Sequence, residues 1–215
     1  MENKLMSKTF FWMCIGLLIT FATGYFVSHN EMMIINIFKN STYLILCIVE
    51  LVLVIALSAK ARTMGKNTAR IFFILYSFVT GLTFSSIFIV YELTSILYVF
   101  LLAAVVFLVF GLIGYYTNLD LTRIGTYLMM ALFAVIICFL INLFTNSDTF
   151  DLIISIISLL VFIGFTAYDV QKIKRLSEDG DIPEDNLSIV GALELYLDYI
   201  NIFLDLLRIF GNSRD

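Results

Sequence analysis

Seven long apolar runs dominate the pattern of hydrophobic and polar positions along the chain. Each run is long enough to cross a bilayer as a helix, because about 20 residues at a rise of about 1.5 Å match a hydrocarbon core of about 30 Å. The polar segments between the runs are mostly short, so consecutive helices are expected to be antiparallel neighbours. The runs predict seven helices, over about 9-27, 42-59, 71-90, 96-116, 121-144, 152-171 and 189-210.

The last run differs from the other six because it carries a line of charged and polar side chains. Glu194, Asp198, Asn201, Asp205 and Arg208 follow one another at spacings of 4, 3, 4 and 3, which places them within about 80° on one face of a helix. A carboxylate that faced lipid here would cost on the order of 2.5–3.5 kcal/mol. This face must therefore contact protein or water, and the C-terminal helix is predicted to be central in the bundle.

The composition supports an all-α membrane protein. Hydrophobic residues make up 61% and charged residues 14% of the chain, and the mean hydropathy is +1.00, all far outside the range of soluble domains. The excess of Phe, Ile and Leu and the single proline favour helices over a β-barrel. The first run is too long for the core of a signal peptide and is interpreted as a retained span. We expect one membrane domain over residues 1-215.

The basic residues indicate the orientation, since Lys and Arg favour cytoplasmic loops. With the N-terminus inside, ten of the thirteen Lys and Arg residues fall in cytoplasmic segments, and an odd number of spans then puts the C-terminus outside. The bases are few and lie mainly at helix ends, so nucleic-acid binding has no support. Cys14, Cys47 and Cys138 lie inside apolar runs without CxxC spacing, as expected of small hydrophobic residues rather than disulfides or metal ligands.

Two aspartates carry the candidate chemistry. Asp169 lies in FTAYDVQKIKR and Asp198 in LYLDYIN, and both can reach the cytoplasmic half of the bundle if the sixth helix continues to about Leu176. Two carboxylates in a low-dielectric bundle cannot both ionise cheaply, so the pair should titrate as a unit. Calcium prefers such oxygen ligands, about six to eight in number. The spacing predicts a pH-sensing calcium site with Asp169 and Asp198 as metal ligands; a structural hydrogen-bonded pair is the alternative.

Further polar residues could extend this site. Glu50 in the second span is either a protonated acid that hydrogen-bonds a neighbouring helix or part of an ion path. Glu194, Asn201 and Asp205 share the polar face of the last helix with Asp198 and are further candidates for the ion path. Apart from calcium as a bound or transported ion, no cofactor is indicated.

The segment AYDVQKIK and the last span, ALELYLDYINIFLDLLRIFG, resemble the Bax inhibitor family, the transmembrane BAX inhibitor motif proteins. The resemblance covers nearly the whole chain and implies seven helices with the C-terminal one surrounded by the other six, together with a pH-sensitive calcium leak. The family's paired aspartates fall on Asp169 and Asp198. In the family a basic residue at the cytoplasmic end of the second helix can latch this pair, and here Lys60 and Arg62 both lie there.

The leading hypothesis is therefore a passive, pH-sensitive calcium channel or leak in a lipid bilayer, expected in a prokaryotic plasma membrane. A regulatory protein that binds and modulates another membrane protein is the alternative, with its partner unknown. An intramembrane aspartyl protease is less favoured, because that class needs GxGD at its second aspartate where this chain has LYLD. We expect the protein not to be an enzyme.

Overall fold

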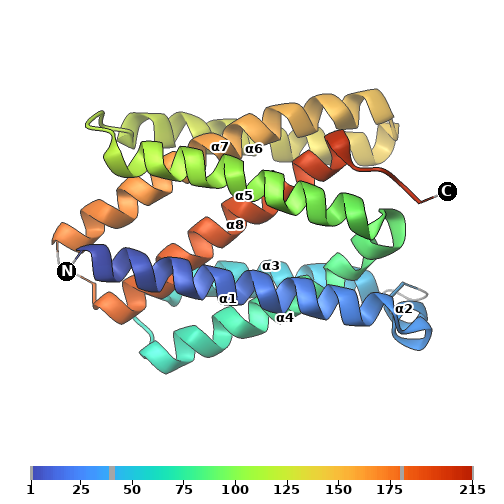
Figure 1. Ribbon diagram of the computed structural model, residues 1–215, viewed down its shortest axis with the longest axis horizontal. Helices are drawn as coiled ribbons and strands as arrows, with labels where there is room; N and C mark the ends of the chain where they lie inside the picture. Colours follow the sequence, from blue (N-terminus) through green and yellow to red (C-terminus); the bar gives the residue numbers. More distant parts are fainter. Residues whose placement is uncertain (1, 39–41, 180–181, 215) are drawn as a thin grey trace. The chain divides into compact units, whose positions relative to one another are not determined.

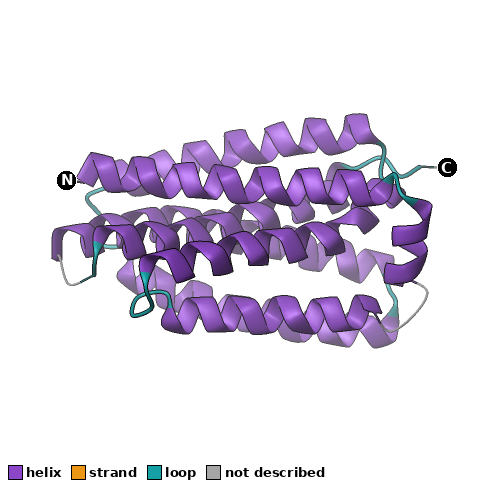
Figure 2. Ribbon diagram, turned by 90° about the horizontal axis from the view of Figure 1, so that it is seen from below, coloured by secondary structure: helices purple, strands orange, loops and turns teal. Residues whose placement is uncertain are grey.

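A computed structural model describes residues 2–38, 42–179 and 182–214, which fold almost entirely as helices (Figure 2). The helices of these ranges are α1 (Glu2–Ser28), α2 (Glu31–Phe38), α3 (Thr42–Lys60), α4 (Lys66–Val90), α5 (Leu93–Tyr116), α6 (Thr122–Thr145), α7 (Asp148–Asp179) and α8 (Glu184–Phe210). Within the same ranges all but α2 are long and apolar enough to cross a membrane, which makes seven candidate spans. The predicted all-α fold with seven spans is confirmed, and its orientation stays a prediction.

Several helices extend beyond the apolar runs that predicted them. α7 continues to Asp179, beyond Leu176, which is the length that the predicted site at Asp169 required. α1, α4 and α8 begin in polar residues. Hydropathy cannot detect these polar turns, because ion pairs and hydrogen bonds hold them. The pattern also missed α2, whose eight residues EMMIINIF are apolar but far too short to span the membrane.

The chain divides into two compact units. Unit 1 comprises Met1–Glu92, Leu176–Tyr196 and Ser213–Asp215, and unit 2 comprises Leu93–Arg175 and Leu197–Asn212. Unit 1 thus holds α1–α4 with the first half of α8, and unit 2 holds α5, α6, most of α7 and the second half of α8 (Figure 1). The expectation of a single domain over residues 1-215 stays a prediction.

In unit 1, small residues bring α1 and α4 into close contact. A Cβ atom added at Gly16 would lie 2.7 Å from the Phe73 ring, and one added at Gly81 would lie 2.9 Å from the carbonyl oxygen of Thr20. Side chains larger than hydrogen at these positions would push the two helices apart. These two glycines therefore allow the close packing of α1 against α4.

The start of α8 is tied into unit 1 by ion pairs and hydrogen bonds. The Asp185 carboxylate forms ion pairs with three basic side chains of α1 and α4, with N–O distances of 3.4 Å to Lys8, 3.6 Å to Lys66 and 3.2 Å to Arg70. The next residue, Asn186, donates to the backbone oxygens of Ala61 and Met64 at 2.8 and 2.7 Å, where α3 ends. Acidic residues in the first turn also suit the positive end of the helix dipole.

In unit 2, a left-handed turn reverses the chain between α6 and α7. Asn146 has φ 45°, a conformation that asparagine adopts more readily than most residues. The Asn142 side chain accepts the backbone N–H of Ser147 at 3.2 Å, and the Ser147 hydroxyl accepts the N–H of Phe150 at 3.3 Å. The second of these caps the first turn of α7.

α8 is the most buried of the candidate spans, with 78% of its apolar window buried against 50% or less for the others. This burial agrees with the prediction that polar side chains on this helix face protein. Its Asp198 and Asp205 are both less than 5% exposed.

Candidate ion site in unit 2

Asp169 lies near the middle of the second half of α7 and is 7% exposed. The Lys172 Nζ atom donates to its Oδ1 atom at 3.3 Å, one turn further along the same helix. Lys172 also lies over the ring of Tyr168, with 5.7 Å between Nζ and the ring centroid. The buried Asp169 carboxylate is therefore paired with Lys172, whose long side chain extends back along the helix toward it.

The residues that follow Asp169 clamp α7 to the loop between α5 and α6. The Gln171 amide donates to the Leu119 carbonyl at 2.8 Å, and its oxygen accepts the Leu121 N–H at 3.0 Å. Arg175 donates to Asp120 and to the Thr122 hydroxyl, each at 2.7 Å. These contacts fix the rotation and the height of α7 at the turn that carries Asp169.

The same loop gives the site a charged rim. Asp120 lies in the loop between α5 and α6. Hydrogen bonds from the Thr122 hydroxyl and backbone N–H, and to a lesser extent from Arg175, hold the pKa of Asp120 below its ordinary value. The Asp120 side chain is largely exposed, and the slight burial that it has opposes this lowering without cancelling it. Asp120 therefore keeps its charge, and its contact with Arg175, throughout the neutral and mildly acidic range.

Two glycines let α5 and α6 approach this part of α7. A Cβ atom added at Gly114 of α5 would overlap the backbone of Ala167, and one added at Gly125 of α6 would overlap the Tyr168 ring. Ala167 and Tyr168 directly precede Asp169, so close packing on two sides immobilises the backbone next to the acid.

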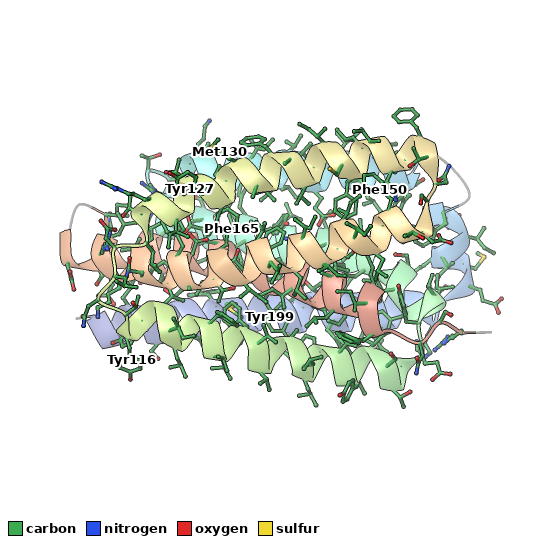
Figure 3. All side chains as sticks on the ribbon, turned by 90° about the horizontal axis from the view of Figure 1, so that it is seen from above. Tyr116, Tyr127, Met130, Phe150, Phe165 and Tyr199 are labelled. Carbon is green, nitrogen blue, oxygen red and sulfur yellow. The ribbon has the colours of Figure 1, made fainter. Side chains whose placement is uncertain are left out.

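Asp198 lies on α8 and is 4% exposed. The adjacent Tyr199 anchors α8 to α5: its hydroxyl donates to the Phe100 carbonyl at 2.8 Å, and its ring meets those of Phe100 and Phe107 edge-on. Figure 3 shows Tyr199 and Phe165 among the helices of this unit, whereas Tyr116 and Met130 point outward. The residue next to Asp198 is thus held against α5 by a hydrogen bond and aromatic packing.

The two aspartates lie toward the same end of unit 2. α7 and the second half of α8 are antiparallel, because Ser158 interacts with Asp205, and Asp151, earlier on α7, pairs with Arg208, later on α8. Asp169 is eleven residues, or about 16 Å, beyond Ser158, and Asp198 is seven residues, or about 10 Å, before Asp205. The two residues therefore differ by about 6 Å in their position along the helix axes.

The other predicted residues divide between the two units. Glu50, Glu194, Lys60 and Arg62 belong to unit 1, and the two bases are exposed where α3 ends. Asn201 and Asp205 belong to unit 2, with Asn201 donating to the Leu197 carbonyl of its own helix at 2.8 Å. That bond uses one of the two amide hydrogens of Asn201, and the place of Asn201 in an ion path stays a prediction.

A second charged group lies at the end of unit 2 where α7 begins. Asp205 is 3% exposed and interacts with Ser158, Arg208 and Asp151. Arg208 reaches Asp151 at 4.0 Å and covers the Phe139 ring at 4.8 Å. Within the described ranges, no three His, Cys, Asp or Glu side chains come together as a metal site, so neither acid group has the ligand set of a closed metal centre.

Sequence reasoning missed the residues that support Asp169. Lys172 follows Asp169 by three residues, the spacing of ion pairs on a helix, and this spacing could have identified it. Gln171 and Tyr199 gave no signal, because their partners are backbone carbonyls on other elements.

The architecture is that of a multi-pass helical membrane protein with buried acids in its spans. The chain matches, over residues 2–215, the family described as inhibitor of apoptosis-promoting Bax1. It is 42% identical to the inner membrane protein YbhL of Escherichia coli strain K12, over 97% of this chain and 92% of that protein. A protein of Borreliella burgdorferi is 41% identical over 100% of this chain and 94% of its own length.

One further relative is a membrane protein of Streptococcus pyogenes serotype M1, 41% identical over 77% of this chain and 72% of that protein. The chain therefore belongs to the Bax inhibitor family, and it is a multi-pass protein of a bacterial plasma membrane.

Proposed function

We propose that this protein is a passive, pH-sensitive calcium leak in which Asp169 and Asp198 form the gate. One observation carries the proposal: two acids, each less than a tenth exposed, occupy one unit on antiparallel helices. Ionisable groups inside membrane spans are expensive and are typical of ion and proton pathways. Membership of the Bax inhibitor family supports the same activity by resemblance.

The ligand set suits a transported ion better than a stored one. Calcium prefers about six to eight oxygen ligands, whereas two aspartates supply four carboxylate oxygens at most. Water must then complete the coordination, which makes binding weak. An ion that is held weakly can leave again, and this is what conduction requires.

Protonation supplies the pH dependence. When both carboxylates are charged, the site attracts a cation and Lys172 holds Asp169 from one turn away. Uptake of a proton removes that charge and weakens the contact with Lys172, which shifts the balance between closed and open arrangements. Lys172 is thus a latch candidate beside Lys60 and Arg62, the two bases that the family resemblance suggested.

Calcium entry into vesicles that contain the purified protein tests this proposal. Asp169→Asn and Asp198→Asn should each abolish the pH dependence of calcium flux, because neither asparagine can titrate. Asp148→Asn is the matched control, since Asp148 is an exposed residue at the start of the same helix as Asp169, and should leave the flux unchanged. Equal flux for the wild type and both site variants at every pH would refute the gate.

A regulatory role remains the second candidate. A protein that modulates another membrane protein would show no flux alone and would co-purify with a stoichiometric partner. Both results together would favour that role over the leak.

A further inference from the structure

A polar line crosses the apolar interior of unit 1 between α3 and α4. On α3, Tyr43, Cys47 and Glu50 follow at spacings of 4 and 3, and on α4 Tyr76, Thr80, Thr83 and Ser86 follow at spacings of 4, 3 and 3. These spacings place each set on one helix face. Such hydroxyls commonly serve helix packing, but here they surround an acid.

The Glu50 carboxyl group lies against two hydroxyls of α4. The Thr80 hydroxyl donates to Oε1 at 2.8 Å. The Thr83 hydroxyl lies 3.2 Å from Oε2 and 2.8 Å from the Thr80 carbonyl oxygen, so its one hydrogen serves either acceptor in turn. Glu50 is half-buried and lies eight residues after the start of α3, or about 12 Å along the helix. The carboxyl group therefore lies near the middle of its span, held by neutral donors.

The line continues inward from Glu50 to α1 and α8. Thr80 also interacts with the hydroxyls of Tyr76 and Tyr196. The Tyr196 hydroxyl lies 2.6 Å from the Thr20 hydroxyl, which donates to the Ser77 carbonyl at 2.8 Å. Because the Thr20 hydrogen is used in that bond, Tyr196 is the donor to Thr20.

This arrangement leaves one hydrogen too few for all the contacts of Thr80. Its own hydrogen points to Glu50, and the hydrogen of Tyr196 points to Thr20, so the contact between Thr80 and Tyr196 forms only if one of these hydroxyls turns. Hydroxyls rotate freely between such partners. The Glu50 proton can be exchanged along the line by a relay, in which each hydroxyl accepts a proton from one neighbour, releases its own to the next and then turns back.

The line also continues outward, toward the end of unit 1 where α3 begins. Tyr43, one residue after the first residue of α3, interacts with Cys47 on its own helix and with Ser86 on α4. The Ser86 hydroxyl donates to the Thr83 carbonyl at 2.9 Å. Polar groups thus lead from one end of the span to the acid in its middle.

We propose that Glu50 is a proton-binding site that is reached through these hydroxyls from the end of unit 1 where α3 begins. The titratable groups that face Glu50 in unit 1 are Cys47 and Tyr43 on α3, Tyr76 on α4 and Tyr196 on α8. All four are neutral at pH 7 in their ordinary states, so the carboxyl exchanges a proton without a counter-ion. Its single carboxylate offers too few oxygens for calcium.

This site goes beyond the calcium leak and does not depend on it. Infrared difference spectra of the purified protein in lipid, recorded between about pH 5 and about pH 9, detect the C=O stretch of a protonated carboxylic acid across the range where shifted acids titrate. We expect a titrating band that Glu50→Gln removes and that Asp169→Asn and Asp198→Asn leave in place. Thr80→Val should raise its frequency, because the carbonyl loses a donor, and this variant keeps Glu50 itself.

The access route has its own test, which is the rate of hydrogen-to-deuterium exchange of that band. Ser86→Ala should slow the exchange by up to about tenfold, the equivalent of one lost hydrogen bond. Ser85→Ala is the matched control: Ser85 is a buried neighbour whose hydroxyl donates to the Leu82 carbonyl at 2.6 Å, away from the line. A carboxyl band that never titrates, or equal exchange in the two serine variants, would overturn the proposal.

Discussion

Gly114 and Gly111 of α5 provide a paired test of the packing around the candidate site. Both glycines are buried and face α7. A Cβ atom at Gly111 would lie 3.8 Å from a methyl group of Val170 and 3.9 Å from one of Thr166, which is ordinary van der Waals contact. A Cβ atom at Gly114 would instead overlap the backbone of Ala167, which no side-chain rotation can relieve.

The two substitutions by alanine should therefore have opposite signs. Gly111→Ala gains helix propensity without a clash and should stabilise the protein by up to about 1 kcal/mol. Gly114→Ala forces α5 and α7 apart and should destabilise it by about 1–3 kcal/mol, the typical cost of overpacking.

Unfolding of both variants in mixed micelles of dodecyl maltoside and SDS measures the two free energies on one scale. Calcium flux in vesicles adds a second readout, since Ala167 lies two residues before Asp169 and its displacement should alter the gate. Equal destabilisation of the two variants would refute the claim that backbone contact at Ala167 sets the distance between these helices.

Other predictions follow from contacts at the ends of the spans. Gln171→Ala loses two hydrogen bonds to the α5–α6 loop and should lower the free energy of unfolding by about 1–3 kcal/mol, whereas Glu178→Ala, an exposed change on the same helix, should not. Asn186→Ala should cost a similar amount, because two backbone carbonyls lose their donor. The pKa of Asp120 is lowered in the folded state, so the contribution of its contact with Arg175 is complete above the ordinary value of 3.8 and is lost as the pH falls through the lowered one; amide exchange of residues 117–121 should show this loss, and Asp120→Asn should remove its pH dependence.

The seven spans could be predicted because lipid imposes one simple rule, that backbone groups must pair within apolar helices of sufficient length. The burial of Asp169 and Asp198 could be predicted for the same reason, since a charged group that faces lipid is costly, whereas their role as an ion site stays a prediction. The polar first turns of α1, α4 and α8 could not be predicted. The ion pairs that hold them join Lys8 and Arg70 to acids more than a hundred residues away in sequence.

The support of the site was equally hidden from the sequence. Gln171 binds carbonyl and amide groups that every residue possesses, so its side chain gives no clue to its partner. Thr80 and Thr83 are small polar residues, which in membrane spans usually serve helix packing, so the sequence gives no reason to relate them to Glu50. Their position opposite Glu50 depends on the register between α3 and α4, and periodicity does not define that register.

The division of α8 between the two units has a consequence for how the protein is made. α8 is made after the other described helices and is the least hydrophobic of the candidate spans, so its insertion relies on the helices already in the membrane. Until it arrives, Lys8, Lys66 and Arg70 lack the acids that neutralise them, and α5 lacks the Tyr199 anchor. Each unit is therefore incomplete until its own half of α8 has been made, and a premature stop before α8 would leave both units open to degradation.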